Sequence, residues 1–337
     1  MKNNLSLVFF FLFVIFLLDS RAQVTPPPNS AVANTAQTPI KGPLRLSRNP
    51  NYFEDASGTP LILCGSQTWN TFQDWGTNGT IQPLDFGAFV NFLNAHGHNF
   101  TLLWTTEMPK FHAMPTTETS PPDFIVTPLP WMRTGPGTAT DGGLKFDLTK
   151  FDQAHFDRLR ARVQALNSAG IYAGVYLFSG EWLLRMRCST DGYPLSGGNN
   201  INGIDDGYRG GTLETAVASV TMKAPNAITG FQDTYVRKVI DMLNDLPNVL
   251  WIVSQEAPEN STWWNNHLIS FVRAYEKGKR YQHPIGYGSL AMDNPQTDSV
   301  LYNSDADWIA PLIRVSPAKT CGRNPDQRGD PVRIRVV

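Results

Sequence analysis

Acidic, amide and tryptophan side chains of this sequence recur at one kind of position, at or just after the ends of short apolar runs. The run Val249–Val253 leads into Gln255 and Glu256, and the run Asn99–Trp104 leads into Glu107. A carboxylic acid can protonate the oxygen that leaves when a glycosidic bond breaks, and a second carboxylate can attack the anomeric carbon or activate water. The residues that share this position are Gln67, Trp69, Asn70, Trp104, Glu107, Glu181, Trp182, Gln255 and Glu256.

Glu256 is the best candidate for the general acid. It follows an apolar run that reads as a strand, and barrel enzymes keep their catalytic groups at the carboxyl ends of their strands. Gln255, directly before it, could hydrogen-bond a sugar hydroxyl near the reacting centre. The alternative is that Glu256 only caps a loop, or caps the helix expected to begin near Thr262.

The tryptophans suit the binding of neutral sugars, because an indole face packs against sugar C–H groups while amides and acids bond the hydroxyls. Any single Trp fits a core position equally well. Trp69, Trp104 and Trp182, however, each lie beside a polar amide or an acid at the end of a different run. This repetition favours a sugar-binding rim that also includes Gln67, Asn70, Glu107 and Glu181.

The elements that must position these residues are those of an α/β protein, since short β-rich runs alternate with segments of helical period. Helices are expected around residues 86–93, 156–166, 235–243 and 264–275. Strands are expected at Leu61–Gly65, Asn99–Trp104, Ile171–Phe178, Val249–Val253, Pro284–Tyr287 and Trp308–Ile313.

Long insertions follow the second and third of these strands, whereas the links from helix to strand are short. This asymmetry is typical of a (β/α)8 TIM-type barrel, whose working face is built from the loops after the strands. A doubly wound sheet is the alternative. It would need a glycine-rich phosphate turn after the first strand, and Gly65-Ser66-Gln67-Thr68 is not such a turn.

The strand count predicts an incomplete barrel of about six β/α units, because only six strand-like runs precede Pro317. The polar segment 319–337 is too short for two more units of roughly 30 residues each. We expect it to be a truncated or frame-shifted end, because an unclosed barrel leaves sheet edges bare. A surface tail on an unusual domain is the alternative.

The N-terminal segment reads as a signal for export. The apolar run Leu7–Leu18 is shorter than the about 20 residues that span a bilayer, and small residues precede a cleavage site near Gln23. We expect a signal peptide at 1–22, a Pro/Ala/Thr-rich linker at 23–42, the barrel at 43–318 and an atypical tail at 319–337. The product would be secreted or periplasmic; an uncleaved anchor is the alternative.

Composition and motifs narrow the classes of function. Lys and Arg number 28 against 29 Asp and Glu, a formal net charge of -1, so nucleic acid is not an expected partner. The six histidines form no HExxH or other ligand pair, and no GxSxG turn follows an apolar run. We therefore expect no metal, no cofactor, no stable membrane insertion after signal cleavage, and a carbohydrate partner.

Four segments together resemble secreted cellulase-like, apiosidase-like glycoside hydrolases of the clan A barrel group. They are Gly65-Ser-Gln-Thr-Trp-Asn70, His98-Asn-Phe-Thr-Leu-Leu-Trp104, Asn199-Asn-Ile-Asn-Gly203 and Asn248-Val-Leu-Trp-Ile-Val-Ser-Gln-Glu256-Ala, and the resemblance spans about residues 43 to 313.

The resemblance implies a retaining glycosidase with Glu256 as acid/base. Those enzymes usually have Asn before that Glu, where this chain has Gln255. They also place the nucleophilic carboxylate after strand seven, for which no run is found here, so only the acid/base role is carried over.

Two functional interpretations follow. The first is an enzyme that hydrolyses O-glycosidic bonds in a poly- or oligosaccharide. The second is a secreted carbohydrate-binding protein without turnover, or an inactive truncated glycosidase, which keeps the rim aromatics and lacks the second carboxylate. A retaining pair stands about 5–5.5 Å apart, so the surroundings of Glu256 distinguish the two.

Overall fold

The computed structural model describes residues 39–49, 51–77, 79–112, 124–180, 183, 187–209, 219–290 and 295–310, all within the unit Gln37–Val337. The expected signal peptide (1–22) and tail (319–337) lie outside the described residues, as do Glu181 and Trp182. Those assignments remain predictions.

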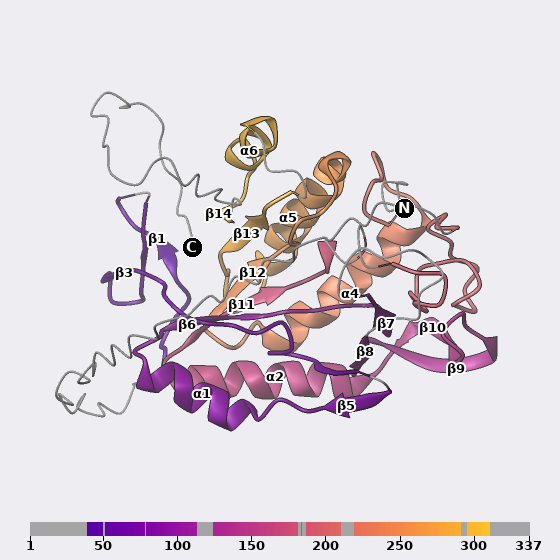
Figure 1. Cartoon of the computed structure of the whole chain (residues 1–337). Helices are drawn as coiled ribbons and strands as arrows, with labels where there is room; N and C mark the ends of the chain where they lie inside the picture. Colours follow the sequence, from indigo (N-terminus) through magenta and orange to yellow (C-terminus); the bar gives the residue numbers. More distant parts are fainter. Residues whose placement is uncertain are drawn as a thin grey trace, which may run out of the picture. The chain divides into compact units, whose positions relative to one another are not determined.

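Five parallel strands form the central sheet, and they lie side by side in the order in which they occur along the chain (Figure 1). A doubly wound sheet would contain a point at which this order reverses, and the described sheet has none. The predicted fold class is confirmed: the sheet is wound as in a (β/α)8 barrel, of which the described residues form a part. The strands are β6 (Phe100–Leu103), β11 (Tyr172–Tyr176), β12 (Val249–Ile252), β13 (Ile285–Gly288) and β14 (Trp308–Ala310).

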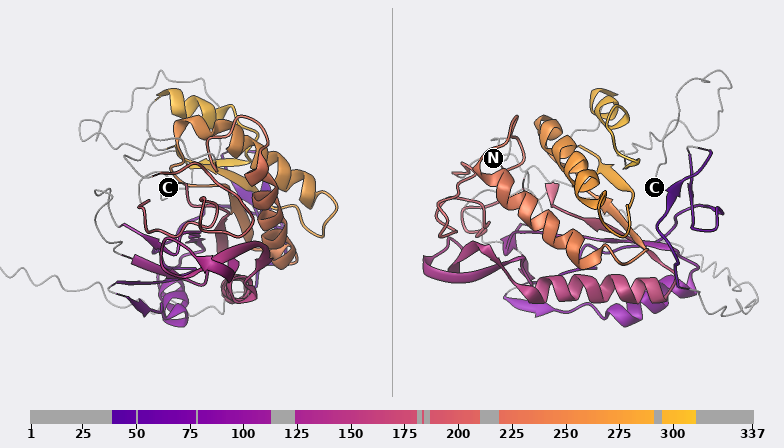
Figure 2. Two further views of the ribbon diagram at one scale, coloured as in Figure 1. Left: turned by 90° about the vertical axis from the view of Figure 1, so that its right-hand side faces the viewer. Right: turned by 180° about the vertical axis from the view of Figure 1, so that it is seen from behind.

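A helix precedes each of these strands along the chain, and neighbouring helices pack in chain order, α1 on α2, α2 on α4 and α4 on α5 (Figures 1 and 2). Two begin at an aspartate: the Asp85 and Asp152 side chains accept hydrogen bonds from N–H groups of the first turn, which have no partner inside the helix. The helices are α1 (Phe86–Ala95), α2 (Gln153–Ser168), α4 (Ala227–Leu243), α5 (Thr262–Glu276) and α6 (Pro295–Tyr302), with a 3-10 turn, η1 (Glu259–Ser261), before α5.

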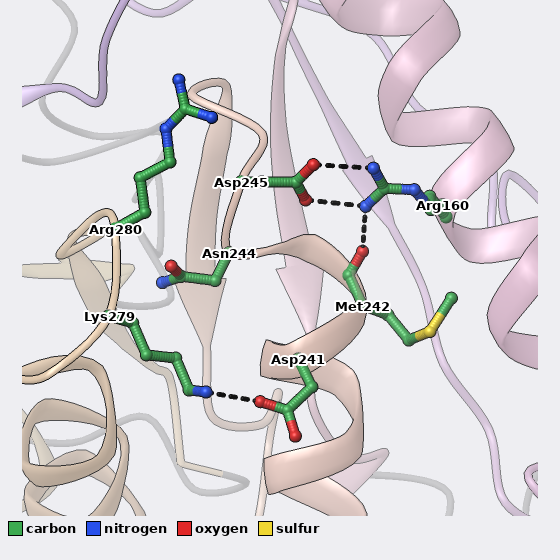
Figure 3. Close-up of a pocket in the computed structure, with 7 residues that line it drawn as sticks. All are labelled: Arg160, Asp241, Met242, Asn244, Asp245, Lys279 and Arg280. Atoms are coloured by element: carbon green, nitrogen blue, oxygen red, sulfur yellow. Dashed lines mark hydrogen bonds and ion pairs between the residues drawn. The ribbon is translucent and has the colours of Figure 1, made fainter.

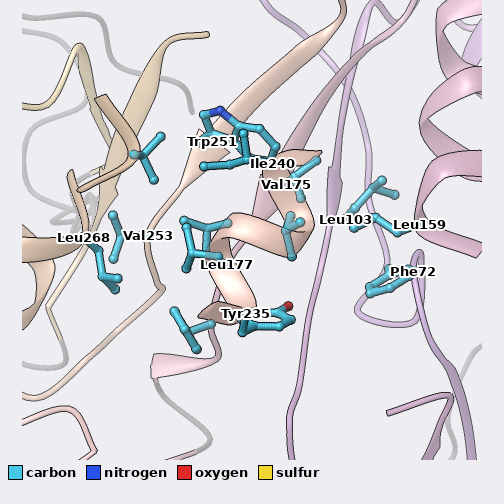
Figure 4. Close-up of a cluster of buried hydrophobic side chains, with 14 of the residues drawn as sticks. Phe72, Leu103, Leu159, Val175, Leu177, Tyr235, Ile240, Trp251, Val253 and Leu268 are labelled. Carbon is cyan, nitrogen blue, oxygen red and sulfur yellow. The ribbon is translucent and has the colours of Figure 1, made fainter. Parts of the chain in front are cut away.

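Two hydrophobic clusters cover the two faces of the sheet. Toward the helices, Val175, Trp251 and Val253 pack in one cluster with Leu159 of α2 and Ile240 of α4 (Figure 4). The alternate residues of the strands belong to a second cluster, which also contains side chains from the N-terminal segment. Its buried members are Leu44, Phe53, Phe100, Tyr172, Tyr176, Leu250, Ile252 and Trp308.

The predicted first strand, Leu61–Gly65, is not a regular strand of the parallel sheet, so this part of the prediction is wrong. Instead β3 (Pro60–Leu61) pairs antiparallel with β2 (Phe53–Glu54), which pairs with β1 (Arg45–Leu46). The chain then runs beside the start of β6, where the Cys64 carbonyl accepts the N–H of Phe100 at 3.2 Å. The segment 61–65 thus occupies the position of a first strand beside β6, but it lacks the regular ladder of backbone hydrogen bonds.

The side chain of Asn99 replaces that ladder. Its Oδ1 accepts the Cys64 N–H at 2.8 Å, and its Nδ2 donates to the Ile62 carbonyl at 2.9 Å. We expect Asn99→Ala to lower the free energy of unfolding by about 1 kcal/mol, because both backbone groups lose their partner. Urea denaturation measures this. Asn91→Ala, at an exposed position of α1, is the control, and equal midpoints for the two variants would contradict the role of Asn99.

Antiparallel strands that the sequence pattern did not indicate lie on both sides of β6 in the chain: β4 and β5 before α1, and β7 to β10 in the insertion after β6. One sheet has the order β5–β4–β8–β7, and β9 and β10 form a separate antiparallel pair. Asp74 of β4 bonds Arg158 of α2 at 2.5 Å, which links this four-stranded sheet to a barrel helix. The strands are β4 (Asp74–Thr77), β5 (Thr80–Gln82), β7 (Lys110–Phe111), β8 (Phe124–Thr127), β9 (Trp131–Thr138) and β10 (Leu144–Phe151).

Candidate functional site

A pocket with a volume of about 90 Å³ lies at the carboxyl ends of β6, β11 and β12. Because the strands are parallel, side chains that follow them come from distant segments and meet at one edge of the sheet. Four of the predicted site residues, Trp69, Trp104, Gln255 and Glu256, line it. The full set of lining residues is Trp69, Trp104, Phe178, Ser179, Gly180, Gln255 and Glu256.

Glu256 is half-buried and has a backbone φ of 49°, the only positive φ at a non-glycine residue in the described ranges. Glutamate rarely adopts this left-handed conformation, and such strain persists only where the surroundings enforce it. The enforcing contacts come from both neighbouring strands. A Cβ on Gly180 would lie 2.3 Å from the Gln255 carbonyl oxygen, and one on Gly288 would lie 1.9 Å from that of Ser254.

Gln255 is held between the two strands that flank β12. Its Oε1 accepts a hydrogen bond from the Tyr176 hydroxyl of β11 at 3.1 Å, and its Nε2 donates to the Ser289 Oγ after β13 at 2.7 Å. A primary amide has a second N–H, so Gln255 can still donate to a ligand in the pocket. Its longer side chain thus bonds residues on both sides of its own strand.

Trp104 forms one wall of the pocket. Its ring stacks on that of Tyr176, with centroids 4.2 Å apart and planes at 12°, and its Nε1 donates to the Gln67 Oε1. Burial, together with the negative charge of Glu256, raises the pKa of Tyr176 well above its usual value. Tyr176 therefore stays a neutral hydroxyl donor, and Gln67 fixes the orientation of the indole.

Trp69 is the most exposed aromatic residue of the pocket. Its side chain is 57% exposed, and its ring lies 6.3 Å from that of Trp75. Asn70, next in the chain, accepts a hydrogen bond from Thr68 at 2.7 Å and is not among the lining residues. One indole face at the mouth of the pocket thus remains open to a ligand.

The structure places Glu107 beneath the pocket instead of on its rim. The residue is fully buried, and its carboxylate accepts hydrogen bonds from the backbone N–H and hydroxyl of Ser179. Burial raises the pKa of Glu107 to about 7, although the bonds from Ser179 oppose the shift. Glu107 therefore cannot touch a ligand directly in this conformation, and the expectation of a rim position is corrected.

Phe178, Ser179 and Gly180 are pocket residues that the sequence analysis did not single out. They follow β11 directly, so they occupy the same position relative to their strand as the predicted residues. Their position after a strand was the available sequence signal for a place in the pocket. It was missed because small or apolar side chains do not suggest chemistry. The sequence around Tyr176 and Ser289 likewise gave no signal that these residues hydrogen-bond Gln255.

A second pocket, of about 520 Å³, lies beside the loops that lead into β12 and β13, at the other end of the sheet (Figure 3). Ion pairs occupy much of its lining: Arg160 bonds Asp245 at 2.7 Å, and Lys279 bonds Asp241 at 2.6 Å. In a barrel this end serves stability. The first ion pair links α2 to the turn after α4, and the second links α4 to the turn after α5.

Two further findings concern the described part of the chain. It holds no group of three or more His, Cys, Asp or Glu side chains arranged to bind a metal ion. None of its helices combines the length and the apolar character needed to cross a membrane.

Comparisons with known proteins concern the fold. No protein-family model matches the sequence, and no curated protein is significantly similar to it. A glycoside hydrolase family 5 mannosidase from Rhizomucor miehei has a similar structure, with a TM-score of 0.50 and 12% identity over 82% of this chain and 62% of that one. A putative glycoside hydrolase from Bacteroides vulgatus has a TM-score of 0.43 and 15% identity, over 78% of this chain and 41% of that one.

The chain thus spans about 40 to 62% of the length of these structures. At such low identity the likeness to the mannosidase bears on the fold alone. It agrees with the strand order of the central sheet, which shows on its own that the chain is wound as part of a (β/α)8 barrel.

Proposed function

We propose that this protein hydrolyses O-glycosidic bonds in a poly- or oligosaccharide, with Glu256 as general acid/base. The observation that carries the proposal is the position of Glu256: an acid on a strained backbone, in a pocket with two indole rings, at the carboxyl edge of a parallel barrel sheet. Backbone strain of this kind is enforced by the surrounding structure and clusters at functional sites.

In the proposed reaction, the Glu256 carboxylic acid protonates the glycosidic oxygen as the bond to the anomeric carbon breaks. Its carboxylate then takes a proton from the water that completes hydrolysis. A retaining mechanism also needs a second carboxylate as nucleophile. Glu256 is the only acid among the described lining residues, so the proposal assigns the acid/base role alone.

Sugar binding is proposed to involve the open face of Trp69, the edge of Trp104 and the free N–H of Gln255. Gln67 contributes by orienting Trp104. Glu181 and Trp182 remain proposed contacts on sequence grounds alone, and Asn70 remains one as the neighbour of Trp69. Aromatic faces with a few directional polar groups suit a neutral sugar. Export to the periplasm or the exterior is proposed on the same sequence grounds as before.

A second candidate function is sugar binding without turnover. It is favoured by the single acid among the described lining residues, since one carboxylate can bind a hydroxyl but does not make a retaining pair. The two functions share the pocket and differ in chemistry.

One experiment separates them. The purified chain is incubated with cello-, manno- and xylohexaose, and products are followed by chromatography while binding is followed by calorimetry. Release of shorter oligosaccharides supports hydrolysis, and heat of binding without products supports the second candidate. Neither binding nor release from any of the three, nor from soluble plant polysaccharide, would contradict both.

Trp69 provides a direct test of the binding surface. We expect Trp69→Ala to raise the Kd for the bound hexaose about tenfold or more, because the sugar loses an apolar contact face. Calorimetry of the variant measures this. Phe92→Ala, which removes an exposed ring from α1, is the control and should bind like the wild type. If both variants bind equally well, Trp69 is not part of the site.

A further inference from the structure

The buried carboxyl of Glu107 has no evident function in hydrolysis. It is 0% exposed and lies beneath the pocket, between the end of β6 and the end of β11. Its oxygens bond the same residue twice: one accepts the Ser179 N–H at 3.2 Å, and the other accepts the Ser179 hydroxyl. Among the described residues its hydrogen-bond partners are uncharged, and burying an acid with such partners is costly.

The contacts continue from Ser179 to the turn that carries Glu256. Gly180, next in the chain, approaches that turn so closely that a Cβ would lie 2.3 Å from the Gln255 carbonyl oxygen and 2.7 Å from the Ala257 nitrogen. On the opposite side, Ala257 forms a parallel bridge with Leu290. The strained residue thus lies between two fixed stretches of backbone.

We propose that Glu107 is a positioning residue: through its two bonds to Ser179 it fixes Gly180 against the turn 255–257 and so holds the Glu256 carboxylate in the pocket. Glu107 itself does not touch the sugar. The consequence for catalysis rests on the proposed function, whereas the mechanical link between Glu107 and the turn does not.

Burial of Glu107 also changes its ionisation. Burial raises the pKa to about 7, against 4.5 for a free glutamate. Tyr193, from the loop after β11, and Tyr235 of α4 lie near Glu107; burial and, after it, the charge of the Glu107 carboxylate raise the pKa of both tyrosines. Because the folded protein binds this proton more tightly than the unfolded chain does, Glu107 lowers stability as the pH rises from about 4.5 to about 7.

The test is hydrogen exchange of the backbone amides in residues 254–257, which needs no substrate. In Glu107→Ala we expect exchange there to become about tenfold faster, because both bonds to Ser179 are lost; in Ser179→Ala we expect a smaller acceleration, because the backbone N–H of residue 179 still bonds Glu107. Glu107→Gln keeps the size of the side chain and can bond Ser179 again, so it should restore protection close to that of the wild type.

The matched control is Glu276→Gln, another buried carboxyl, which bonds Trp251 and His283 near the other end of the sheet. It should leave exchange at 254–257 unchanged. The proposal is overturned if neither Glu107→Ala nor Ser179→Ala accelerates exchange in the turn, or if Glu276→Gln accelerates it equally. If the exchange result holds and no sugar is cleaved, the positioning role stands and the hydrolase proposal falls.

Discussion

Glu256→Gln is expected to reduce hydrolysis by about 10²–10⁴-fold, the usual contribution of a positioned general acid, while the Kd for the oligosaccharide changes little. Glutamine has nearly the same shape as glutamate, so the pocket wall is preserved. Its amide, however, cannot donate a proton to the leaving oxygen. The measurement is the initial rate on the oligosaccharide that the wild type cleaves fastest, together with calorimetric binding of the same compound.

The control is Glu259→Gln, which neutralises an exposed acid only three residues away, at the start of η1. It should retain the full rate. If Glu256→Gln hydrolyses as fast as the wild type, Glu256 is not the acid. If it loses binding and rate together, Glu256 contacts the sugar in the ground state and the assignment as general acid alone is wrong.

The central sheet could be predicted because its strands are buried on both faces. Ile171–Phe178 and Val249–Val253 are continuous apolar runs of strand length, and they became β11 and β12. The helices between them have apolar residues at helical spacing. Strands of two residues, such as β3 and β7, are too short to show a period, and Gly135, Pro136 and Gly137 made β9 look like a loop.

The pocket was predictable to the extent that strand ends determine it. Trp104, Gln255 and Glu256 lie at or within four residues of the ends of β6 and β12, and parallel strands bring such positions together. Glu107 follows the same strand β6 yet lies under the pocket. The direction that a loop takes after its strand depends on tertiary contacts, here the bonds to Ser179, and periodicity carries no information about them.

Backbone strain at Glu256 could not be predicted either. A left-handed φ is expected for glycine and occasionally Asn or Asp, so a glutamate there has no sequence signal. The need for glycine at Gly180 and Gly288 is visible only in the fold, because each allows a close approach of neighbouring backbone that a side chain would prevent. The strained φ and the two closely approached glycines together indicate that the backbone carrying the Glu256 carboxylate is held rigidly.

Arg187→Ala is expected to lower the free energy of unfolding by about 3–5 kcal/mol, the effect of breaking a buried ion pair by removing one partner. The guanidinium is buried, bonds Asp191 and, at 2.9 Å, Asp206, and lies over the ring of Tyr208 at 4.1 Å. Its loss would leave two buried carboxylates without their cation. Urea denaturation gives the free energy, and the midpoint should fall with little change in slope.

The matched control lies in the same loop: Arg209 pairs with Asp205 at 2.5 Å, and both side chains are solvent-exposed. Because water screens such a pair, Arg209→Ala should leave the midpoint unchanged. Arg187 links Asp191 and Asp206 within this loop, so its loss should also accelerate amide exchange in 187–209 ahead of global unfolding. Equal midpoints for the two variants would show that the buried network contributes no net stability, and that apolar packing of Tyr193 and Tyr208 alone holds this loop.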